Sequence, residues 1–350
     1  MYTGRTETAS CEIRRHDLPW MAGAQLAWLS DPVADIRAAI LPAAGGEMAS
    51  LQVRVDGVWQ EILHRALAYT QWPCEETAER APILWPAVGR SFTSDQLATW
   101  RANGQVPARN RYQVAGTVYD IDVHGFARKF PWHLARAGER GGIAFAECTF
   151  ESSQETHPLY PFDFRLSVMY RVGAGTVAIE YKVVAGENPL PMPFSIGNHL
   201  ALRVPFGDAG RFDDCTLRSP GNRILLQNAL CLLSGESVPV DLLTPASLGH
   251  RELLDTVLGG SRREDVWLEL NDPALLRLRL SHAELSTGRR GHTKDENLLF
   301  VFWGDPAGGF FCPEPWVGKP NSLNTGDGAV CLERGQRFVW EIRIQPLTRG

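Results

Sequence analysis

Residues 164–183, FRLSVMYRVGAGTVAIEYKV, decide the fold class of this chain. Apolar and polar side chains alternate on both sides of the central glycines, and a period of two places successive side chains on opposite faces of a pleated strand. The Gly-Ala-Gly at 173–175 is typical of a tight turn. The segment therefore predicts a hairpin of two antiparallel strands, each with one buried and one wet face.

The same alternation recurs at 276–280 and 338–345, whereas helical signals are few. The best helix candidate is 94–103, with Ser94 as its expected N-cap and Gly104 as its stop. No internal repeat, low-complexity tract or Pro/Gly/Ser-rich linker divides the chain. We expect an all-β protein, built as one large antiparallel β-sandwich with few short helices.

Composition limits the function classes. The chain has 350 residues, which is long for one domain but within the range of large sandwiches. Its net charge of -5 comes from interspersed charges without a basic stripe, which argues against a nucleic-acid partner. The seven cysteines are scattered and form no CxxC pair, so we expect neither a disulfide framework nor a zinc ribbon. We expect a soluble, unexported, cytoplasmic protein with no membrane partner, because no apolar run reaches the length of a span and the N-terminus is polar.

Two stretches place basic side chains among apolar neighbours. ILWPAVGR (83–90) ends in Arg90, whose planar guanidinium suits adjacent acceptors such as sugar hydroxyls. VHGFARKFPW (123–132) carries His124 and Arg128 within an aromatic segment. Taken alone, Arg90 fits a surface arginine at a strand end, and His124 fits a histidine at the edge of the core.

Two further stretches carry a candidate acid/base pair. His199 interrupts the apolar run MPFSIGNHLALRVPF, and its ordinary pKa near 6.5 lets it give or take a proton at physiological pH. Glu314 lies between Pro313 and Pro315 in FFCPEPWVGKP, and prolines make a poor central strand but a rigid mount at a pocket rim. The alternatives are a histidine satisfied by backbone carbonyls and an exposed loop glutamate.

Together these stretches resemble the aldose 1-epimerase (mutarotase) family, within the galactose-mutarotase-like superfamily. The resemblance runs over nearly the whole chain and rests on AAILPAAGGEMASLQV (38–53), WPAVGR, HGFAR, ETHPLYPFDFRLSVMY (155–170), PFSIGNH, EPWVG and LERGQRFVWEIRI (332–344). HGFAR and EPW resemble especially the branch that includes hexose-6-phosphate epimerases. The resemblance implies one mutarotase-like sandwich domain over 25–350 and an N-terminal extension without a counterpart over 1–24.

The resemblance also implies roles for individual residues and no cofactor. His199 corresponds to the general acid that protonates the ring oxygen, and Glu314 to the general base that takes the anomeric hydroxyl proton. His124 corresponds to a second histidine near the ring oxygen, and Arg90 to an arginine that binds sugar hydroxyls. Asp255 corresponds to an aspartate that contacts further hydroxyls, although Asp265 and Asp272 lie close in sequence.

Several points stay open at this stage. A pocket for a sugar phosphate would need several cationic side chains that converge on it. The candidates near the motifs are Arg128, Lys129, Arg203 and Lys319. An equal alternative is that these four are solvated charges at the ends of strands. Trp316 is a candidate platform for the C–H face of a sugar, as are Trp85, Phe126 and Trp132, although such residues are more often core. We expect a small-molecule sugar as the partner and a monomer or homodimer.

Three other function classes compete. A non-catalytic carbohydrate-binding or sensor protein could retain the sandwich and its pocket. A glycoside hydrolase would need two opposed carboxylates, for which Glu314 and Asp255 are available, but His199 would then be unexplained. A metal-dependent enzyme is disfavoured, because no His-x-His pair occurs among the nine histidines.

Overall fold

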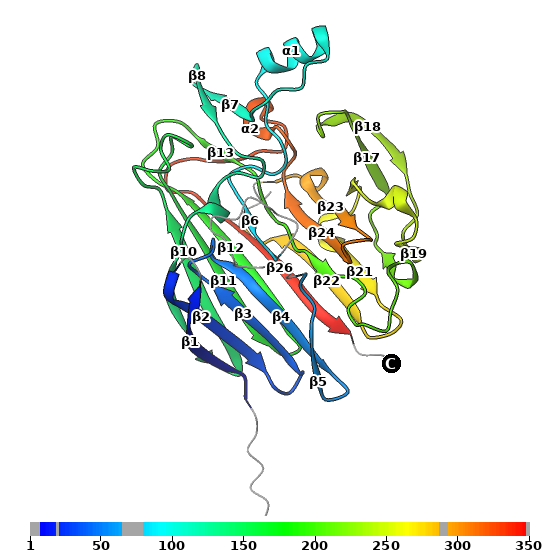
Figure 1. Ribbon diagram of the computed structural model, residues 1–350. Helices are drawn as coiled ribbons and strands as arrows, with labels where there is room; N and C mark the ends of the chain where they lie inside the picture. The colour runs from blue at the N-terminus through cyan, green and yellow to red at the C-terminus, as the bar shows by residue number, and fades with distance from the viewer. Residues whose placement is uncertain (1–7, 19–20, 65–79, 287–292, 348–350) are drawn as a thin grey trace, which may run out of the picture.

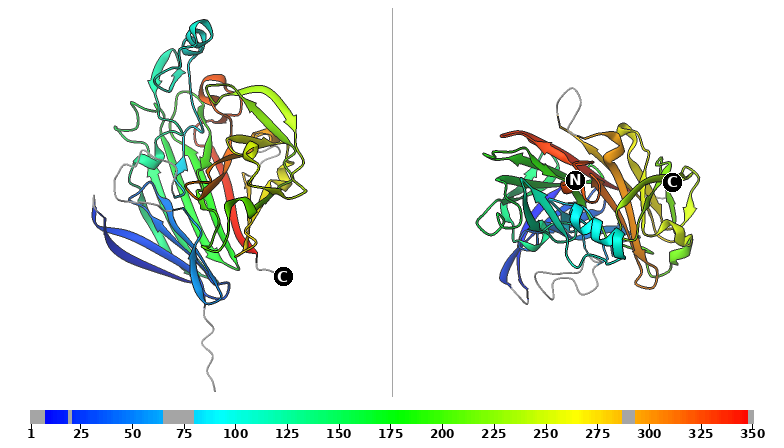
Figure 2. Two further views of the ribbon diagram at one scale, coloured as in Figure 1. Left: turned by 45° about the vertical axis from the view of Figure 1, so that its right-hand side comes forward. Right: turned by 90° about the horizontal axis from the view of Figure 1, so that it is seen from above.

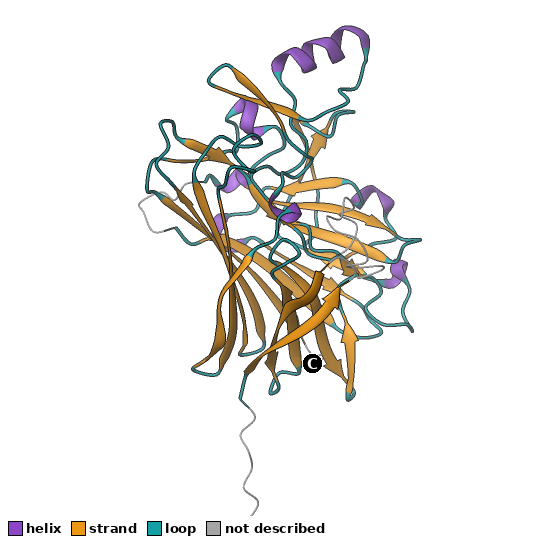
Figure 3. Cartoon of the chain, turned by 60° about the vertical axis from the view of Figure 1, so that its left-hand side comes forward, coloured by secondary structure: helices purple, strands orange, loops and turns teal. Residues whose placement is uncertain are grey.

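The computed structural model describes residues 8–18, 21–64, 80–286 and 293–347, and strands dominate it (Figures 1 and 3). The largest sheet has nine strands in the order β19 (Ala246–Ser247), β16 (Thr216–Arg218), β21 (Trp267–Asn271), β22 (Arg277–Glu284), β26 (Arg337–Leu347), β12 (Thr176–Ala185), β11 (Phe164–Gly173), β10 (Ile143–Glu151) and β9 (His133–Arg140). A five-stranded sheet follows chain order through β1 (Ser10–Leu18), β2 (Met21–Asp31), β3 (Ile36–Leu41), β4 (Glu47–Val55) and β5 (Val58–Glu61).

An eight-stranded sheet carries the segments with candidate catalytic residues. Its order is β18 (Leu233–Pro239), β17 (Arg223–Gln227), β20 (Thr256–Gly259), β23 (Leu298–Asp305), β24 (Phe310–Val317), β14 (Ile196–Asn198) and β6 (Ile83–Leu84), and β15 (Leu202–Arg203) also pairs with β24. Two small pairs complete the strands described: β7 (Arg111–Val114) with β8 (Thr117–Asp120), and β13 (Met192–Phe194) with β25 (Val330–Leu332). The expected all-β antiparallel architecture is confirmed.

The predicted hairpin is also confirmed. β11 and β12 pair along their lengths, ending with Gly173 opposite Thr176. Ala174 and Gly175 form the turn with φ values of 51° and 72°, and two positive φ angles are what a type I′ hairpin turn requires. β26 pairs with β12, and β22 pairs with β26, so the segments with the clearest alternation lie side by side in the nine-stranded sheet.

The expected helix is present, but its N-cap differs from the expectation. α1 spans Ser94–Asn103 and ends at Gly104, whose φ of 72° is left-handed. Thr93, not Ser94, is the N-cap: its hydroxyl accepts the Gln96 N–H at 3.4 Å, and the Gln96 side chain accepts the Thr93 N–H at 3.0 Å. This capping box needs a glutamine three residues after the cap, which only Thr93 has.

The remaining helical turns are short, and no helix among the described residues is long and apolar enough to cross a membrane. They are α2 (Ser322–Thr325) and the 3₁₀ turns η1 (Ala127–Lys129), η2 (Phe212–Asp214), η3 (Arg251–Leu253), η4 (Arg263–Asp265) and η5 (Asp295–Asn297).

The nine-stranded sheet packs one face against both other large sheets (Figure 2). β2 and β3 contact β10 and β11, and on the other side His282 of β22 packs against Phe300 of β23 with ring centroids 4.8 Å apart. One continuous apolar cluster includes Ile40, Val168 and Phe302, which come from the three sheets. Burial of apolar surface in this shared core therefore holds the sheets together.

The N-terminal segment is part of the five-stranded sheet. β1 pairs with β2, from Ser10 opposite Ser30 to Leu18 opposite Met21. β2 runs through the expected boundary between residues 24 and 25, and its Leu29 is fully buried. In the structure this segment therefore adds a strand hairpin to the sandwich.

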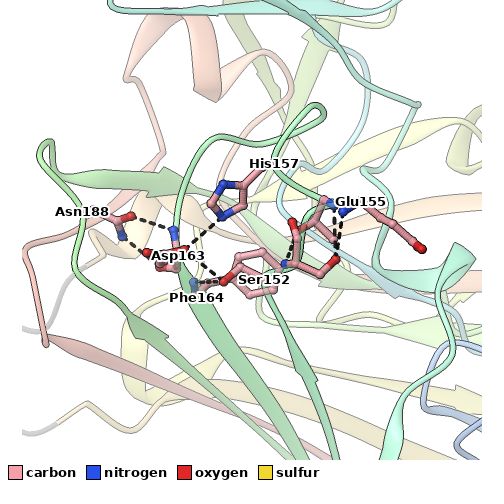
Figure 4. A network of polar contacts seen from close by, with 8 residues as sticks. Ser152, Glu155, His157, Asp163, Phe164 and Asn188 are labelled. Carbon is pink, nitrogen blue, oxygen red and sulfur yellow. Dashed lines mark hydrogen bonds and ion pairs between the residues drawn. The ribbon is translucent and has the colours of Figure 1, made fainter.

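A polar network holds the connection between β10 and β11 (Figure 4). The Asp163 N–H donates to the Asn188 side-chain oxygen at 2.7 Å, and the Asn188 side-chain amide donates to the Asp163 carbonyl at 2.9 Å. His157 Nε2 lies 3.0 Å from Asp163 Oδ1. The same connection carries Tyr160, whose hydroxyl donates to the Pro193 carbonyl at 2.7 Å. The network thus supports the backbone that leads into β14.

Candidate active site

Glu314 lies on β24, an interior strand of the eight-stranded sheet, so the expectation of a poor central strand is wrong. β23 pairs with β24 along its whole length. On the other edge, β15 pairs only with Phe310 and Phe311, and β14 only with Trp316 and Val317. The prolines at 313 and 315 lie between these two paired ends, where their missing N–H groups interrupt one edge without removing the strand.

His199 lies in the interruption between β14 and β15. The pairs that these two strands make with β24 share one register, in which Gly197 faces Trp316. That register places His199 directly opposite Glu314. Paired residues of antiparallel strands project from the same face of a sheet, which brings the imidazole and the carboxyl group together.

The two side chains are in contact and almost inaccessible. His199 Nε2 lies 3.3 Å from Glu314 Oε1, and each residue is 2% exposed. Trp316, two residues along the same strand, donates its indole N–H to Glu314 Oε2 at 3.0 Å. Both carboxyl oxygens therefore have a partner, which fixes the orientation of the group.

The backbone around His199 is anchored from the core side. The His199 N–H donates to the Pro82 carbonyl at 3.0 Å. The neighbouring Asn198 donates its amide to the Ala81 carbonyl and to the Tyr181 hydroxyl, both at 3.0 Å. Within the described part of the chain, His199 Nδ1 is buried and has no hydrogen-bond partner. The imidazole is thus positioned by its backbone and keeps an unused ring nitrogen.

Burial shifts the pKa values of His199 and Glu314 so that the neutral form of each side chain is favoured. The pKa of His199 is lowered to about 3, mainly by desolvation and also by the nearby charges of Arg128 and Arg80. Desolvation also raises the pKa of Glu314 well above its usual range, while the Trp316 hydrogen bond acts in the opposite direction. In this environment a neutral pair that holds one transferable proton is favoured over separate charges.

His124 joins this pair from a tight turn. Its ring centroid lies 5.9 Å from that of His199 and 5.7 Å from that of Trp316. Nδ1 accepts the Gly89 N–H at 3.1 Å, so the neutral ring carries its proton on Nε2. Desolvation, followed by the charge of His199, holds the pKa of His124 well below its usual range.

The turn needs glycine after His124. His124 has φ 66° and Gly125 has φ 71°. A Cβ on Gly125 would press into the backbone carbonyl of Trp85, far inside van der Waals contact. The absence of a side chain on Gly125 therefore lets the HGFAR turn pack closely against the WPAVGR backbone, which places His124 beside Gly89.

The two predicted arginines occupy different settings. Arg128 is buried, and its Nη1 donates to the carbonyls of Val123 at 3.0 Å and Gly125 at 2.7 Å, so it braces the turn that carries His124. Arg90 is half-buried, and its charge contributes to the lowered pKa of His124. The charge of Arg90 is thus within electrostatic range of His124, whereas at least one nitrogen of Arg128 is bound to backbone carbonyls.

Asp255 is separated from the His199–Glu314 pair. It is exposed, has a left-handed φ of 56°, and immediately precedes β20. Thr256 of β20 lies opposite Phe302 of β23, which puts Asp255 at the level of Trp303, two strands away from β24.

The two alternative aspartates have structural partners. Asp272 is buried and accepts the N–H groups of Phe206 at 2.9 Å and Ala274 at 2.8 Å. Asp265 accepts the indole N–H of Trp267 at 2.5 Å. Of the three aspartates, only Asp255 adjoins the eight-stranded sheet, because Asp265 and Asp272 lie at the two ends of β21 in the nine-stranded sheet.

The phosphate candidates other than Arg128 form ion pairs. Lys129 Nζ lies 2.9 Å from Asp122, and Lys319 Nζ lies 2.9 Å from Asp327. Arg203 pairs with Asp208. In the described ranges no group of three or more His, Cys, Asp or Glu side chains could hold a metal ion.

Residues 37–345 match the profile of the family described as Aldose 1-epimerase. The chain belongs to the aldose 1-epimerase family. The sequence-based assignment to this family is confirmed.

Relatives of this aldose 1-epimerase family member include the LacX protein of Lactococcus lactis subsp. lactis, 28% identical over 138 residues. That match covers 39% of this chain and 41% of LacX, so the chain matches about two fifths of the curated relative. A galactose mutarotase-like protein from Clostridium acetobutylicum superposes with TM-score 0.73 at 15% identity, covering 97% of this chain and 99% of the other. The Slr1438 protein from Synechocystis sp. PCC 6803 superposes with TM-score 0.70 at 23% identity, and the match covers 93% of this chain and 96% of the other. These structures share the fold.

Within this epimerase fold, sequence reasoning missed Trp303. It lies on β23 opposite Cys312, on the same sheet face as Glu314, with its ring centroid 5.5 Å from that of His199. The local pattern does not single it out, because Trp303 ends a continuous apolar run, LLFVFW (298–303), without alternation. Its place beside His199 depends on how β23 and β24 align, which one sequence does not reveal. Trp316, the candidate platform, donates its N–H to Glu314.

Proposed function

We propose that the protein interconverts the α and β anomers of an aldose by acid/base ring opening, with His199 and Glu314 as the proton-transfer pair. The observation that carries this proposal is the contact of 3.3 Å between His199 Nε2 and Glu314 Oε1. A buried imidazole and carboxyl group, held opposite each other, can serve two oxygens of one sugar ring. General acid/base groups of this kind each contribute typically 10²–10⁴-fold.

One shared proton is sufficient for the reaction. His199 as the acid protonates the ring oxygen while Glu314 as the base takes the anomeric hydroxyl proton, and the C1–O5 bond breaks to give the aldehyde. Rotation about C1–C2 and closure on the other carbonyl face reverse both transfers. This assignment requires the proton on the imidazole when the sugar is bound, and the Trp316 hydrogen bond, which lowers the Glu314 pKa, favours that arrangement.

The neighbouring residues have positioning roles in this proposal. The Nε2–H of His124 is a donor for the ring-oxygen region, because its Nδ1 is occupied by Gly89. Arg90 is the donor for hydroxyls on the same side, and Asp255 is an acceptor for hydroxyls at the far edge. Arg128 acts through the turn that it braces.

A neutral hexose is the proposed substrate, and a hexose 6-phosphate is the alternative. Lys129, Arg203 and Lys319 each have a carboxylate partner, which supports the neutral sugar. The anomers of glucose, galactose and glucose 6-phosphate can be followed by polarimetry with and without the protein. Accelerated mutarotation of a neutral hexose supports the proposal, acceleration of glucose 6-phosphate alone transfers it to the phosphorylated substrate, and no acceleration of any aldose contradicts it in favour of a sugar-binding protein.

A further inference from the structure

The outer edge of β1 is the edge of a sheet. β1 stands at one end of the five-stranded sheet, where it pairs with β2, and no other strand of the described chain pairs with it. It lies on the outside of the molecule, in dark blue at the lower left of Figure 1. The strand is nine residues long, and most of its residues are exposed. A row of backbone N–H and C=O groups of this length is a template for one more strand.

Charged side chains often protect such an edge from pairing, but the charges of β1 are self-complementary. The strand reads SCEIRRHDL (10–18), in which Glu12 and Arg14 flank Ile13. Glu12 and Arg14 project from the same face, and their side chains are 61% and 50% exposed. Ile13 projects from the other face and is 43% exposed. The edge therefore presents one acid, one base and one apolar side chain around a single central residue.

A second copy of β1 can pair with this edge in antiparallel orientation around a two-fold axis. Directly opposed residues lie on the same face of a sheet, so the axis passes through one residue, which then faces itself. With the axis at Ile13, Glu12 faces the partner's Arg14, and Arg14 faces the partner's Glu12. The two Ile13 side chains meet between them on the other face. This register overlaps residues 10–16 of each copy.

The neighbouring registers of the same pairing are less favourable. An axis at Glu12 sets two carboxylates opposite each other, and an axis at Arg14 or Arg15 does the same with two guanidinium groups. Like charges directly opposite each other destabilise a sheet. An axis nearer either end of the strand shortens the overlap, and at the C-terminal end it crosses the irregular register between His16 and Leu18. The central register alone pairs opposite charges without these defects.

Contacts within the chain hold these charges at the edge. Arg14 donates to Glu12 of its own strand at 2.7 Å, and its guanidinium lies over the Trp28 ring of β2, 5.5 Å from the ring centroid. In the paired form, each Arg14 has a carboxylate on its own strand and one on the partner strand. The four side chains then form a cluster of alternating charge on the outer face of the joined sheet, in which each charge has two opposite neighbours.

We propose that β1 is a dimerisation strand, which pairs in antiparallel orientation with β1 of a second copy of this chain around a two-fold axis at Ile13. Main-chain hydrogen bonds between the two strands join the five-stranded sheets into one continuous sheet. Of the two oligomeric states expected from the sequence, the inference selects the homodimer. The candidate active site lies on the eight-stranded sheet, so this inference does not depend on the proposed function.

The test is the mass of the full chain in solution, measured by sedimentation velocity over a series of micromolar concentrations. We expect the wild-type protein to reach twice the chain mass of 38.8 kDa. Arg14→Glu sets a carboxylate opposite Glu12, and Glu12→Arg sets a guanidinium opposite Arg14, so each variant should lose the dimer. Lys294→Glu is the matched control and should keep it, because Lys294 and Glu296 form an exposed ion pair with the same spacing, away from β1.

Restoration of the dimer separates this register from a loss of the fold. The double variant Glu12→Arg/Arg14→Glu again pairs opposite charges with itself, and an equimolar mixture of the two single variants does so as a heterodimer. Both should return to the dimer mass, with unchanged circular dichroism. A wild-type protein that stays monomeric or forms a larger assembly overturns the proposal. So does a dimer that survives either single reversal, and so does the failure of either combination to restore it.

Discussion

At the scale of single residues, the central feature is the buried contact between His199 and Glu314. Their burial shifts each pKa toward the neutral form, and in the proposed mechanism their contact lets one proton move between them. Trp316 adjusts this balance by donating to the carboxyl group. Perturbed titratable groups of this kind are frequent at functional sites.

Replacing His199 by Asn should remove most of the epimerase activity and preserve the fold. The loss expected for one proton-transfer group is about 10²–10⁴-fold in kcat. His250→Asn is the matched control, because the His250 imidazole is exposed and pairs with the exposed Glu252 at 3.4 Å. Initial rates by polarimetry, with circular dichroism as the fold check, measure both variants; full activity in folded His199→Asn would refute its role.

Replacing Trp316 by Phe should move the acidic limb of the pH–rate profile to higher pH. The indole N–H lowers the pKa of Glu314, so its removal raises that pKa and reduces the carboxylate fraction at any given pH. The profile of kcat/KM against pH is the measurement. A limb that stays in place, or that moves to lower pH, would show that this hydrogen bond does not control the base.

At the scale of elements, the site depends on two contacts between distant segments that sequence patterns do not encode. They are the contact of His199 with Glu314 and the packing of the Gly125 turn against the Trp85 backbone. Alternation alone predicted the β11–β12 hairpin and the β22 and β26 strands, because side-chain period is a local property. The resemblance to the family supplied His199 and Glu314 as candidates. Their alignment across the proline-interrupted edge of β24 is a long-range register, which is set by tertiary packing. The brace from Arg128 and the Trp316 hydrogen bond follow from the same packing.

Replacing Gly125 by Ala should destabilise the protein and reduce its activity together. The left-handed φ of 71° costs about 1–2 kcal/mol for alanine, and the collision with the Trp85 carbonyl adds to it. Gly116→Ala is the matched control, since Gly116 has φ 84° in the β7–β8 turn and open space around its Cβ position. Thermal melting should show a larger drop for Gly125→Ala; equal drops would refute the close approach.

At the scale of the whole molecule, one continuous core joins the three large sheets, and the site lies on the opposite face of the eight-stranded sheet. Phe300 and Phe302 of β23 point into the core, whereas Val301 and Trp303 point to the face that carries Glu314. Glu314 of the candidate pair therefore lies on a strand whose other face is fixed by packing against the core. The family assignment over residues 37–345 includes the whole eight-stranded sheet and nearly all of the nine-stranded sheet, whereas β1 and β2 of the five-stranded sheet lie outside it.

The N-terminal strands should differ in their contribution to stability. β1 is almost wholly exposed, whereas Ala27 and Leu29 of β2 are fully buried in the core. A chain that begins after residue 18 should fold and retain activity, with greater aggregation because the edge of β2 is uncovered. A chain that begins after residue 31 should fail to fold. Circular dichroism and size-exclusion chromatography distinguish these outcomes, and loss of the fold in the shorter deletion would contradict them.

The most direct test of the central claim is proton exchange NMR between the α and β anomers of a neutral hexose, with wild-type protein and with Glu314→Gln. The substitution keeps the size of the side chain and removes the base. We predict exchange well above the spontaneous rate for the wild-type protein and a reduction of about 10²–10⁴-fold in the variant. Equal acceleration by both proteins would contradict the proposed pair.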